Sequence, residues 1–134
     1  MKKPKRKTLV KNLDDIFSKY IRLKNADKNG FCTCVTCGKK GYWTKDNIHC
    51  GHFISRKHYA TRWDERNVSA MCHYCNTYKY GEQYKFSLYL GADLAQELYL
   101  KSKTICKITN KELQDKIDKY KLLVKDLEKL FITL

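Results

Sequence analysis

The fold is decided by two cysteine motifs, Cys34-Val-Thr-Cys37 and Cys72-His-Tyr-Cys75. In each motif two residues separate the cysteines, a spacing with which one turn offers two thiolates to a single tetrahedral Zn²⁺. Two such pairs in one chain predict a closed structural zinc site with Cys34, Cys37, Cys72 and Cys75 as ligands. The interval between the pairs is longer than in a simple zinc ribbon, so a further structure must be inserted there.

The chain has 7 cysteines. An odd number argues against a framework in which all cysteines form disulfides. The basic N-terminus has no apolar segment behind it, so it does not look like a secretory signal, and disulfides are therefore not expected. Cys32 could replace Cys34 as a zinc ligand, because Cys32-Thr-Cys34 offers both thiols, but the two-residue spacing favours Cys34. Cys50 and Cys106 are expected to be buried, unreactive thiols.

Composition and charge indicate the class of partner. The 134 residues suit one domain, and a hydrophobic content of 43% excludes a wholly disordered chain. Lys and Arg number 28 against 14 Asp and Glu, a net charge of +14. The positive electrostatic field of this charge favours the phosphate backbone of DNA or RNA as partner over an anionic membrane surface, because no single basic amphipathic helix dominates.

No apolar run approaches the roughly 20 residues that span a bilayer, so we expect a cytoplasmic protein.

Helices are expected on both sides of the cysteine motifs. Residues 1–11 contain six basic residues and no acid, which predicts a flexible basic arm that lies along phosphates, or a merely solvated tail. Residues 13–24 have apolar side chains at helical spacing, with Asn12 as the N-cap. Residues 84–90 and 92–101 predict two more helices, broken by the glycine between them.

The longest predicted helix covers residues 109–130 and starts with the capping box Thr109-Asn-Lys-Glu112. Such a helix usually buries one apolar face. Its apolar residues recur at alternating spacings of 4 and 3: Leu113, Ile117, Tyr120, Val124, Leu127 and Phe131. This pattern is typical of a homodimer seam, and it also suits antiparallel packing on the N-terminal helix. Of these two interpretations we favour the homodimer.

The insert between the cysteine motifs has its own order. An apolar, strand-like segment covers residues 48–54, and a basic loop follows at 55–59. The segment 66–71 then supplies an asparagine, Asn67, and a second strand, and Asn76 stands directly behind the last cysteine. The order is therefore cysteine motif (here called a knuckle), strand with histidine, loop, asparagine, strand, second knuckle and an asparagine at a helix start.

This order resembles the HNH endonucleases, in which a ββα-metal motif packs a hairpin on one helix around a divalent ion. His52, Asn67 and Asn76 carry the resemblance, which is closer to the zinc-containing subset that includes the phage endonuclease VII resolvases. Further motifs are similar to the NinG family, the Rap recombination proteins of lambdoid phages, over about residues 20–130. These motifs are Gly51-His-Phe53, Asp64-Glu-Arg-Asn-Val68 and Lys79-Tyr-Gly81.

The resemblance implies an α+β fold with a small ββα-metal core on a four-cysteine zinc site, flanked by an N-terminal helix and C-terminal helices. A single nuclease domain would cover residues 12–134, with the zinc core at 31–81 and a helical part at 84–131. It also implies a phage- or prophage-encoded, structure-specific endonuclease that acts in the bacterial host cell on branched DNA, such as Holliday junctions and D-loops. A homodimer would cut one strand per site.

Each predicted catalytic residue has a chemical reason and an alternative. His52 suits a general base, because imidazole titrates near working pH, or it is a zinc ligand or a structural histidine. Asn67 would fix the hairpin loop and orient His52, or serve only as a turn residue. Asn76 would bind Mg²⁺ or Mn²⁺ through its carbonyl oxygen, or cap the helix after the knuckle.

One position departs from the family pattern. HNH enzymes commonly place a metal-binding Asp or His directly before the general base, and here that residue is Gly51. Strand alternation puts His49 on the same face, so His49 is the predicted substitute ligand. A water, or an acid from Asp64-Glu65, is the competitor. If none supplies the ion, the chain would bind junctions without cutting them.

Basic and aromatic residues alternate around the predicted site. The cations expected to bind DNA phosphates are Arg56, Lys57, Arg62, Lys79 and Lys85. The tyrosines at 59, 74, 78 and 80 and Trp63 either stack on unpaired bases or belong to the core. Two other functions remain open: a non-catalytic zinc-ribbon module that binds nucleic acid, and an HNH nicking nuclease for ordinary duplex DNA.

Overall fold

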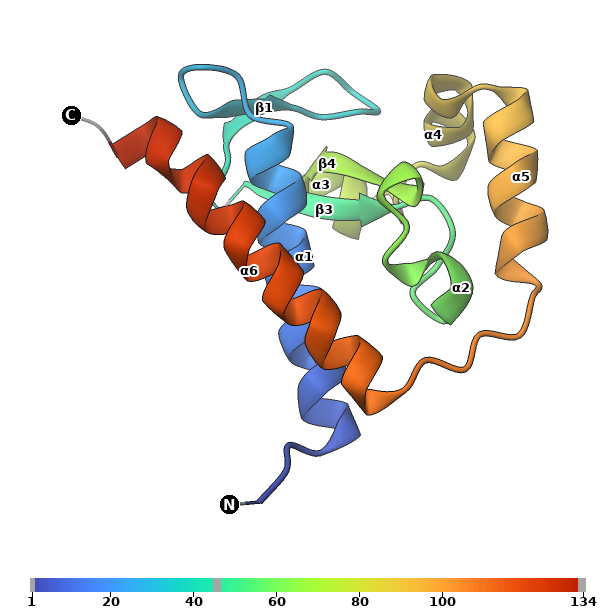
Figure 1. Cartoon of the computed structure of the whole chain (residues 1–134). Coiled ribbons are helices and arrows are strands. Elements are labelled where there is room, and N and C mark those ends of the chain that lie inside the picture. Colours follow the sequence, from blue (N-terminus) through green and yellow to red (C-terminus); the bar gives the residue numbers. More distant parts are fainter. Residues whose placement is uncertain (1, 45–46, 133–134) are drawn as a thin grey trace.

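The computed structural model describes residues 2–44 and 47–132 (Figure 1). Within these ranges helices frame a small central region of strands. In chain order the elements are α1 (Arg6–Lys24), β1 (Phe31–Thr33), β2 (Lys40–Tyr42), β3 (Ile48–His52), α2 (Tyr59–Arg62), the 3₁₀ turn η1 (Glu65–Asn67), β4 (Val68–Cys72), α3 (His73–Thr77), α4 (Gln83–Leu90), α5 (Ala92–Ser102) and α6 (Asn110–Ile132).

The largest helix contact joins α1 and α6, which cross on one side of the strands (Figure 1). Both helices bury the apolar face that their spacing predicts. The buried residues are Leu9, Leu13, Phe17 and Ile21 on α1 and Leu113, Ile117, Tyr120 and Val124 on α6. The rings of Phe17 and Tyr120 meet edge to face, 5.1 Å apart.

The two long helices run in the same direction, so the predicted antiparallel packing is wrong. Arg6 bonds Asn110 at the start of both helices, and Lys19 pairs with Glu128 near their ends. The reason is topological: the segment between α5 and α6 returns the chain to the beginning of α1 (Figure 1). Because α1 already covers most of the a/d face of α6, a dimer through this helix would have to use other residues, such as the exposed Leu122.

The start of α1 also differs from the expectation. The helix begins at Arg6 after Lys5, so Asn12 is not its N-cap, and much of the predicted flexible arm is helical. The side chain of Leu9 explains the difference, because it is only 4% exposed and joins the core shared with α6. Because Leu9 is buried against α6, the basic residues around it are part of helix α1.

Two local predictions are confirmed. Thr109 and Glu112 form the capping box: each backbone N–H bonds the other's side chain at 3.1 Å. Gly91 separates α4 from α5 with φ of +89°, a backbone conformation that favours glycine.

The central strands form an antiparallel pair that is followed directly by a short helix. In the pair β3–β4, His49 lies opposite Met71 and His52 lies opposite Val68, while α3 starts immediately after β4. Every residue of β4 is buried, because one core cluster lies on the α1–α6 side and another lies among the cysteines. The separate hairpin β1–β2 carries the first knuckle between its strands.

Candidate metal centre and adjoining pocket

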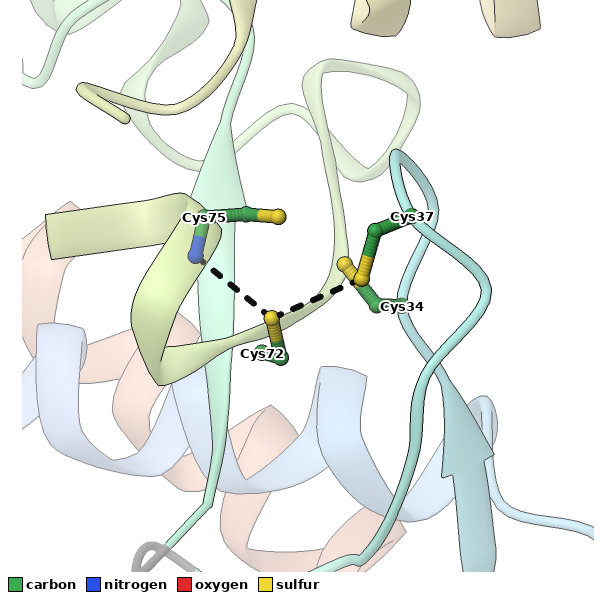
Figure 2. A group of neighbouring side chains, drawn as sticks. All are labelled: Cys34, Cys37, Cys72 and Cys75. Carbon is green, nitrogen blue, oxygen red and sulfur yellow. Dashed lines mark hydrogen bonds between the residues drawn. The ribbon is translucent and has the colours of Figure 1, made fainter. Parts of the chain in front are cut away.

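The four knuckle cysteines meet at one point (Figure 2). Their Sγ atoms all lie within 4.8 Å of one another, and the Cys37 and Cys72 sulfurs are 3.8 Å apart. A tetrahedral Zn²⁺ with Zn–S bonds of about 2.3 Å sets its sulfurs about 3.8 Å apart. The donor set and its geometry therefore fit a structural zinc ion, so the predicted set of four cysteines is confirmed as one that could hold a metal.

Local structure explains how the chain forms this centre. Cys34 and Cys37 lie in the turn between β1 and β2, where Gly38 has φ of +79° and its N–H bonds the Cys34 carbonyl at 3.0 Å. Cys72 ends β4, and Cys75 lies in the first turn of α3. The thiol of Cys72 accepts a bond from the Cys75 N–H at 3.5 Å (Figure 2), so one sulfur also caps the helix.

The remaining cysteines lie outside the cluster. Cys32 is fully buried and donates to the Arg22 carbonyl at 3.1 Å, and burial raises its pKa to about 11. The preference for Cys34 over Cys32 is therefore confirmed. Burial raises the pKa of Cys34 too, but hydrogen bonds from the Thr36 hydroxyl and nearby backbone N–H groups lower it to about 6. Both Cys50 and Cys106 were expected to be buried. Cys50 is partly buried, and Cys106 is exposed because it lies in the extended segment before α6, so the expectation for Cys106 is wrong.

A pocket of about 760 Å³ lies beside the metal centre, along β3, α1 and the chain after α3. It brings together four predicted site residues, His49, His52, Asn76 and the cation Arg56. Asp14 and Asp15 line it from α1, which the sequence interpretation missed. A signal was present, because these are the only two acids in the first 24 residues.

His52 is held by backbone groups, chiefly by the carbonyl of Arg62 and also by the backbone of Cys50. Its Nε2 bonds the Arg62 carbonyl at 3.0 Å. Because a carbonyl only accepts, Nε2 carries the proton of the neutral ring and Nδ1 is the basic nitrogen. Burial lowers the pKa of His52, opposed in part by the Arg62 carbonyl. The ring is therefore a neutral base at pH 7, and it is not part of the four-sulfur cluster.

Asn67 braces the loop between the two strands. Its side chain is fully buried, and its oxygen accepts from the Ile54 N–H at 2.8 Å. Its amide donates to the carbonyls of Ile54 and Thr61 at 3.0 and 3.1 Å. No hydrogen bond joins Asn67 to His52. Asn67 bonds the neighbours of the residues around His52: its amide reaches the Thr61 carbonyl, directly before Arg62, and its backbone carbonyl accepts from the Phe53 N–H at 2.8 Å.

Asn76 lies against His49 at the pocket. The Asn76 amide donates to His49 Nδ1 at 3.0 Å, and His49 Nε2 lies 3.4 Å from Nδ1 of His73. Burial, followed by the charge of His73, lowers the pKa of His49, so this ring too is neutral at pH 7. Cys72 occupies the N-cap of α3, which rules out helix capping as the role of Asn76. His73 had no assigned role in the sequence interpretation.

Gly51 faces the core and not the pocket centre. A Cβ at this position would stand 2.9 Å from both Cβ and Cε of Met71, so a side chain would fit only if Met71 moved. The competing acids lie elsewhere: Asp64 binds Arg66 and Lys101, while Glu65 binds Lys24 and two tyrosines. Among the predicted substitutes, His49 alone contributes a side chain to the pocket.

The predicted phosphate-binding cations divide into two groups. Arg62 is only 15% exposed at its side chain and binds the Asp14 carboxylate through two nitrogens. It is therefore not available to a phosphate. The others are exposed at the surface: Lys57, Lys79, Arg56, which lies 3.8 Å from the Asp14 carboxylate, and Lys85, which lies 3.4 Å from the Glu82 carboxylate.

The fold and the site define a small, strongly basic α+β protein in which four cysteines that could hold a metal lie beside a histidine-lined pocket. The family model described as Bacteriophage Lambda NinG protein matches residues 1–130. The chain therefore belongs to the NinG family, and membership implies a phage role related to recombination. No curated protein and no solved structure matches the chain. Over the described residues, no helix has the length and apolar character to cross a membrane.

Proposed function

We propose that the chain is a metal-dependent HNH-type endonuclease that cuts branched DNA recombination intermediates. The observation that carries the proposal is the arrangement of the pocket. His52, neutral and fixed by the Arg62 carbonyl, lines the same cavity as the contacting pair His49 and Asn76. A base and a pair of candidate cation ligands at one cavity are what phosphodiester hydrolysis requires.

The protein's own residues divide the chemistry between them. Nδ1 of His52 takes a proton from water as the water oxygen bonds to phosphorus and the bond to the leaving oxygen breaks. The leaving oxygen takes a proton from solvent. Arg56 lines the pocket with an exposed side chain, which suits it to hold the phosphate.

His49 and Asn76 would hold the divalent ion. The ion would stabilise the charge that develops on the phosphate and leaving oxygens. In this structure the Asn76 amide nitrogen lies 3.0 Å from His49 Nδ1, so to hold the ion the amide would turn over and present its carbonyl oxygen beside that nitrogen. Imidazole is a poor ligand for Mg²⁺, which prefers oxygen and near-ideal octahedral geometry. We therefore expect Mn²⁺ to support cutting better than Mg²⁺.

Two features support DNA as the substrate. The net charge of +14 suits a phosphate backbone, and the pairing β3–β4 followed by α3 agrees with the hairpin and helix of HNH enzymes. The choice of branched DNA rests on the recombination role that family membership implies.

A cleavage assay tests the proposal. A synthetic four-way junction and a linear duplex of matched sequence are incubated with Mn²⁺, with Mg²⁺ and without added divalent cation. The proposal expects cation-dependent cuts near the branch and little cutting of the duplex. Equal cutting of both substrates would overturn the branched specificity, and cutting without a cation would overturn the metal mechanism.

One observation favours a second candidate. Because Gly51 leaves no room for the usual metal-binding side chain, the chain could be a zinc-containing module that binds junctions without cutting them. Tight junction binding with no cleavage under either cation would establish this candidate.

A further inference from the structure

We propose that an exposed tyrosine surface beside the pocket stacks the unpaired bases of single-stranded DNA. The surface consists of Tyr74, Tyr78, Tyr80 and Tyr84, on α3, the turn after it and the start of α4. The proposal concerns binding, and it deepens the proposed function by naming the substrate feature that the site would select. It also holds for a protein that binds junctions without cutting them.

The exposure of these rings is the first observation. Tyr74 is 55% exposed, Tyr78 64%, Tyr80 87% and Tyr84 75%. Large side chains usually bury their rings, and an exposed apolar cluster marks an interaction surface. Tyr74 and Tyr78 are neighbours, with ring centroids 5.8 Å apart and ring planes tilted by 40°.

The backbone of Tyr80 is the second observation. Tyr80 has φ of +53°, Gly81 +82° and Glu82 +46°. The left-handed region is uncommon for a bulky residue and is unfavourable there. Hydrogen bonds hold the turn: the Gly81 N–H bonds the Cys75 carbonyl at 2.9 Å, and the Glu82 N–H bonds that of Lys79 at 3.0 Å. Strain of this kind persists mainly at functional sites.

The turn is also hydrogen-bonded to the backbone of the predicted general base, His52. Gln83 Nε2 donates to the His52 carbonyl at 3.4 Å, and Tyr80, Gly81 and Gln83 all line the pocket. A nucleobase that stacks on Tyr80 would therefore lie beside the cavity in which the proposed nuclease cuts the phosphodiester.

Positively charged side chains beside the tyrosine rings indicate that the surface binds a nucleic acid. Lys79 Nζ lies 5.8 Å from the centre of the Tyr74 ring, and Arg56 lies on the same pocket as Tyr80. Aromatic faces interleaved with cations are the chemistry that binds single strands without regard to sequence. A paired duplex hides its base faces, so the surface should favour unpaired DNA over duplex.

The test measures affinity by fluorescence anisotropy, without added divalent cation, so that no cutting is needed. The probes are a labelled single-stranded oligonucleotide and a labelled hairpin duplex of equal length. Tyr80→Asn removes the ring, and asparagine tolerates the left-handed backbone. We expect it to weaken single-strand binding by about five-fold or more while duplex binding changes little. Tyr80→Phe, which keeps the flat ring, should bind as the native protein does.

Tyr99→Ala is the matched control, because Tyr99 is an exposed tyrosine on α5 outside the pocket lining. It should bind both probes as the native protein does. Native single-strand affinity in Tyr80→Asn would overturn the proposal, as would an equal loss on both probes or an equal loss in Tyr99→Ala. If the native chain cuts no junction in the cleavage assay but still prefers the single strand here, the nuclease proposal fails and the stacking proposal stands.

Discussion

Asp14 on α1 and His52 on β3 are joined through a single residue. The Asp14 carboxylate binds the guanidinium of Arg62, and the Arg62 backbone carbonyl accepts the hydrogen bond of His52 Nε2 at 3.0 Å. Trp63 adds a bond from its indole N–H to the same carboxylate at 3.0 Å. The N-terminal helix therefore fixes the residue that orients the predicted base.

Asp14→Asn should lower junction cleavage without removing a reacting group. The amide keeps the shape but loses the charge that holds Arg62, so the His52 ring loses its fixed orientation. Misplacement of this kind costs about ten- to hundred-fold in rate. Single-turnover cleavage of a four-way junction measures it, with Asp126→Asn, an exposed acid on α6, as the control. Native cleavage by Asp14→Asn would contradict the link.

The pH dependence of cleavage should report the same link. Burial lowers the pKa of His52 from 6.5, so the neutral, active ring persists to lower pH than an ordinary histidine, and activity falls only as the pH drops through that lowered pKa. The charge of Asp14 raises this pKa and the charge of Arg56 lowers it. Asp14→Asn should therefore move the acid limb of the rate profile to still lower pH, and a shift to higher pH would contradict the account.

Removal of the predicted zinc should unfold the knuckle region. Folding and metal binding are coupled in closed cysteine sites, so chelation or Cys75→Ser should lower the melting temperature and release about one zinc per chain. Metal analysis and thermal unfolding by circular dichroism measure this. Cys106→Ser, at an exposed thiol outside the cluster, should keep both zinc and stability. A Cys75→Ser protein that retains zinc and native melting would show that the four sulfurs do not form the site.

Leu9 tests whether the basic N-terminal segment is part of the folded core. Because its side chain is 4% exposed against α6, Leu9→Ala should lower the free energy of unfolding by about 2–5 kcal/mol. Leu122→Ala, at a leucine 67% exposed, should change it by less than about 0.5 kcal/mol. Urea denaturation gives both values. If Leu9→Ala and Leu122→Ala both changed the free energy of unfolding by a similarly small amount, the N-terminal segment would not be part of the core.

Gly51→Ala tests the packing that removes the usual metal ligand. The added Cβ would stand 2.9 Å from Met71, a contact that should destabilise the fold by about 1–3 kcal/mol. The same urea titration measures it. A variant as stable as the native chain would show that the position has room for a side chain.

Short-range patterns predicted much of this structure. The capping box at Thr109 and the break at Gly91 depend on neighbouring residues alone, and both are confirmed. The choice of Cys34 over Cys32 followed from the two-residue spacing to Cys37, and Cys34 is the one that lies in the four-sulfur cluster. These features need no knowledge of the distant chain.

Long-range features were beyond the sequence patterns. The parallel course of α1 and α6 depends on where the chain re-enters, which an apolar periodicity does not encode. Arg62 was expected to bind phosphate because its partner, Asp14, lies 48 positions away. The contact of His49 with Asn76 likewise depends on α3 folding back beside β3.

The central claim is that His52 is the general base of a nuclease. The most direct measurement compares single-turnover cleavage of a four-way junction in Mn²⁺ by the native chain, His52→Ala and His58→Ala. His58 lies near His52 in the chain but outside the pocket lining. The account predicts that His52→Ala loses about 10²- to 10⁴-fold in rate with junction binding and zinc content unchanged, while His58→Ala cuts normally. Cleavage by His52→Ala at the native rate would contradict it.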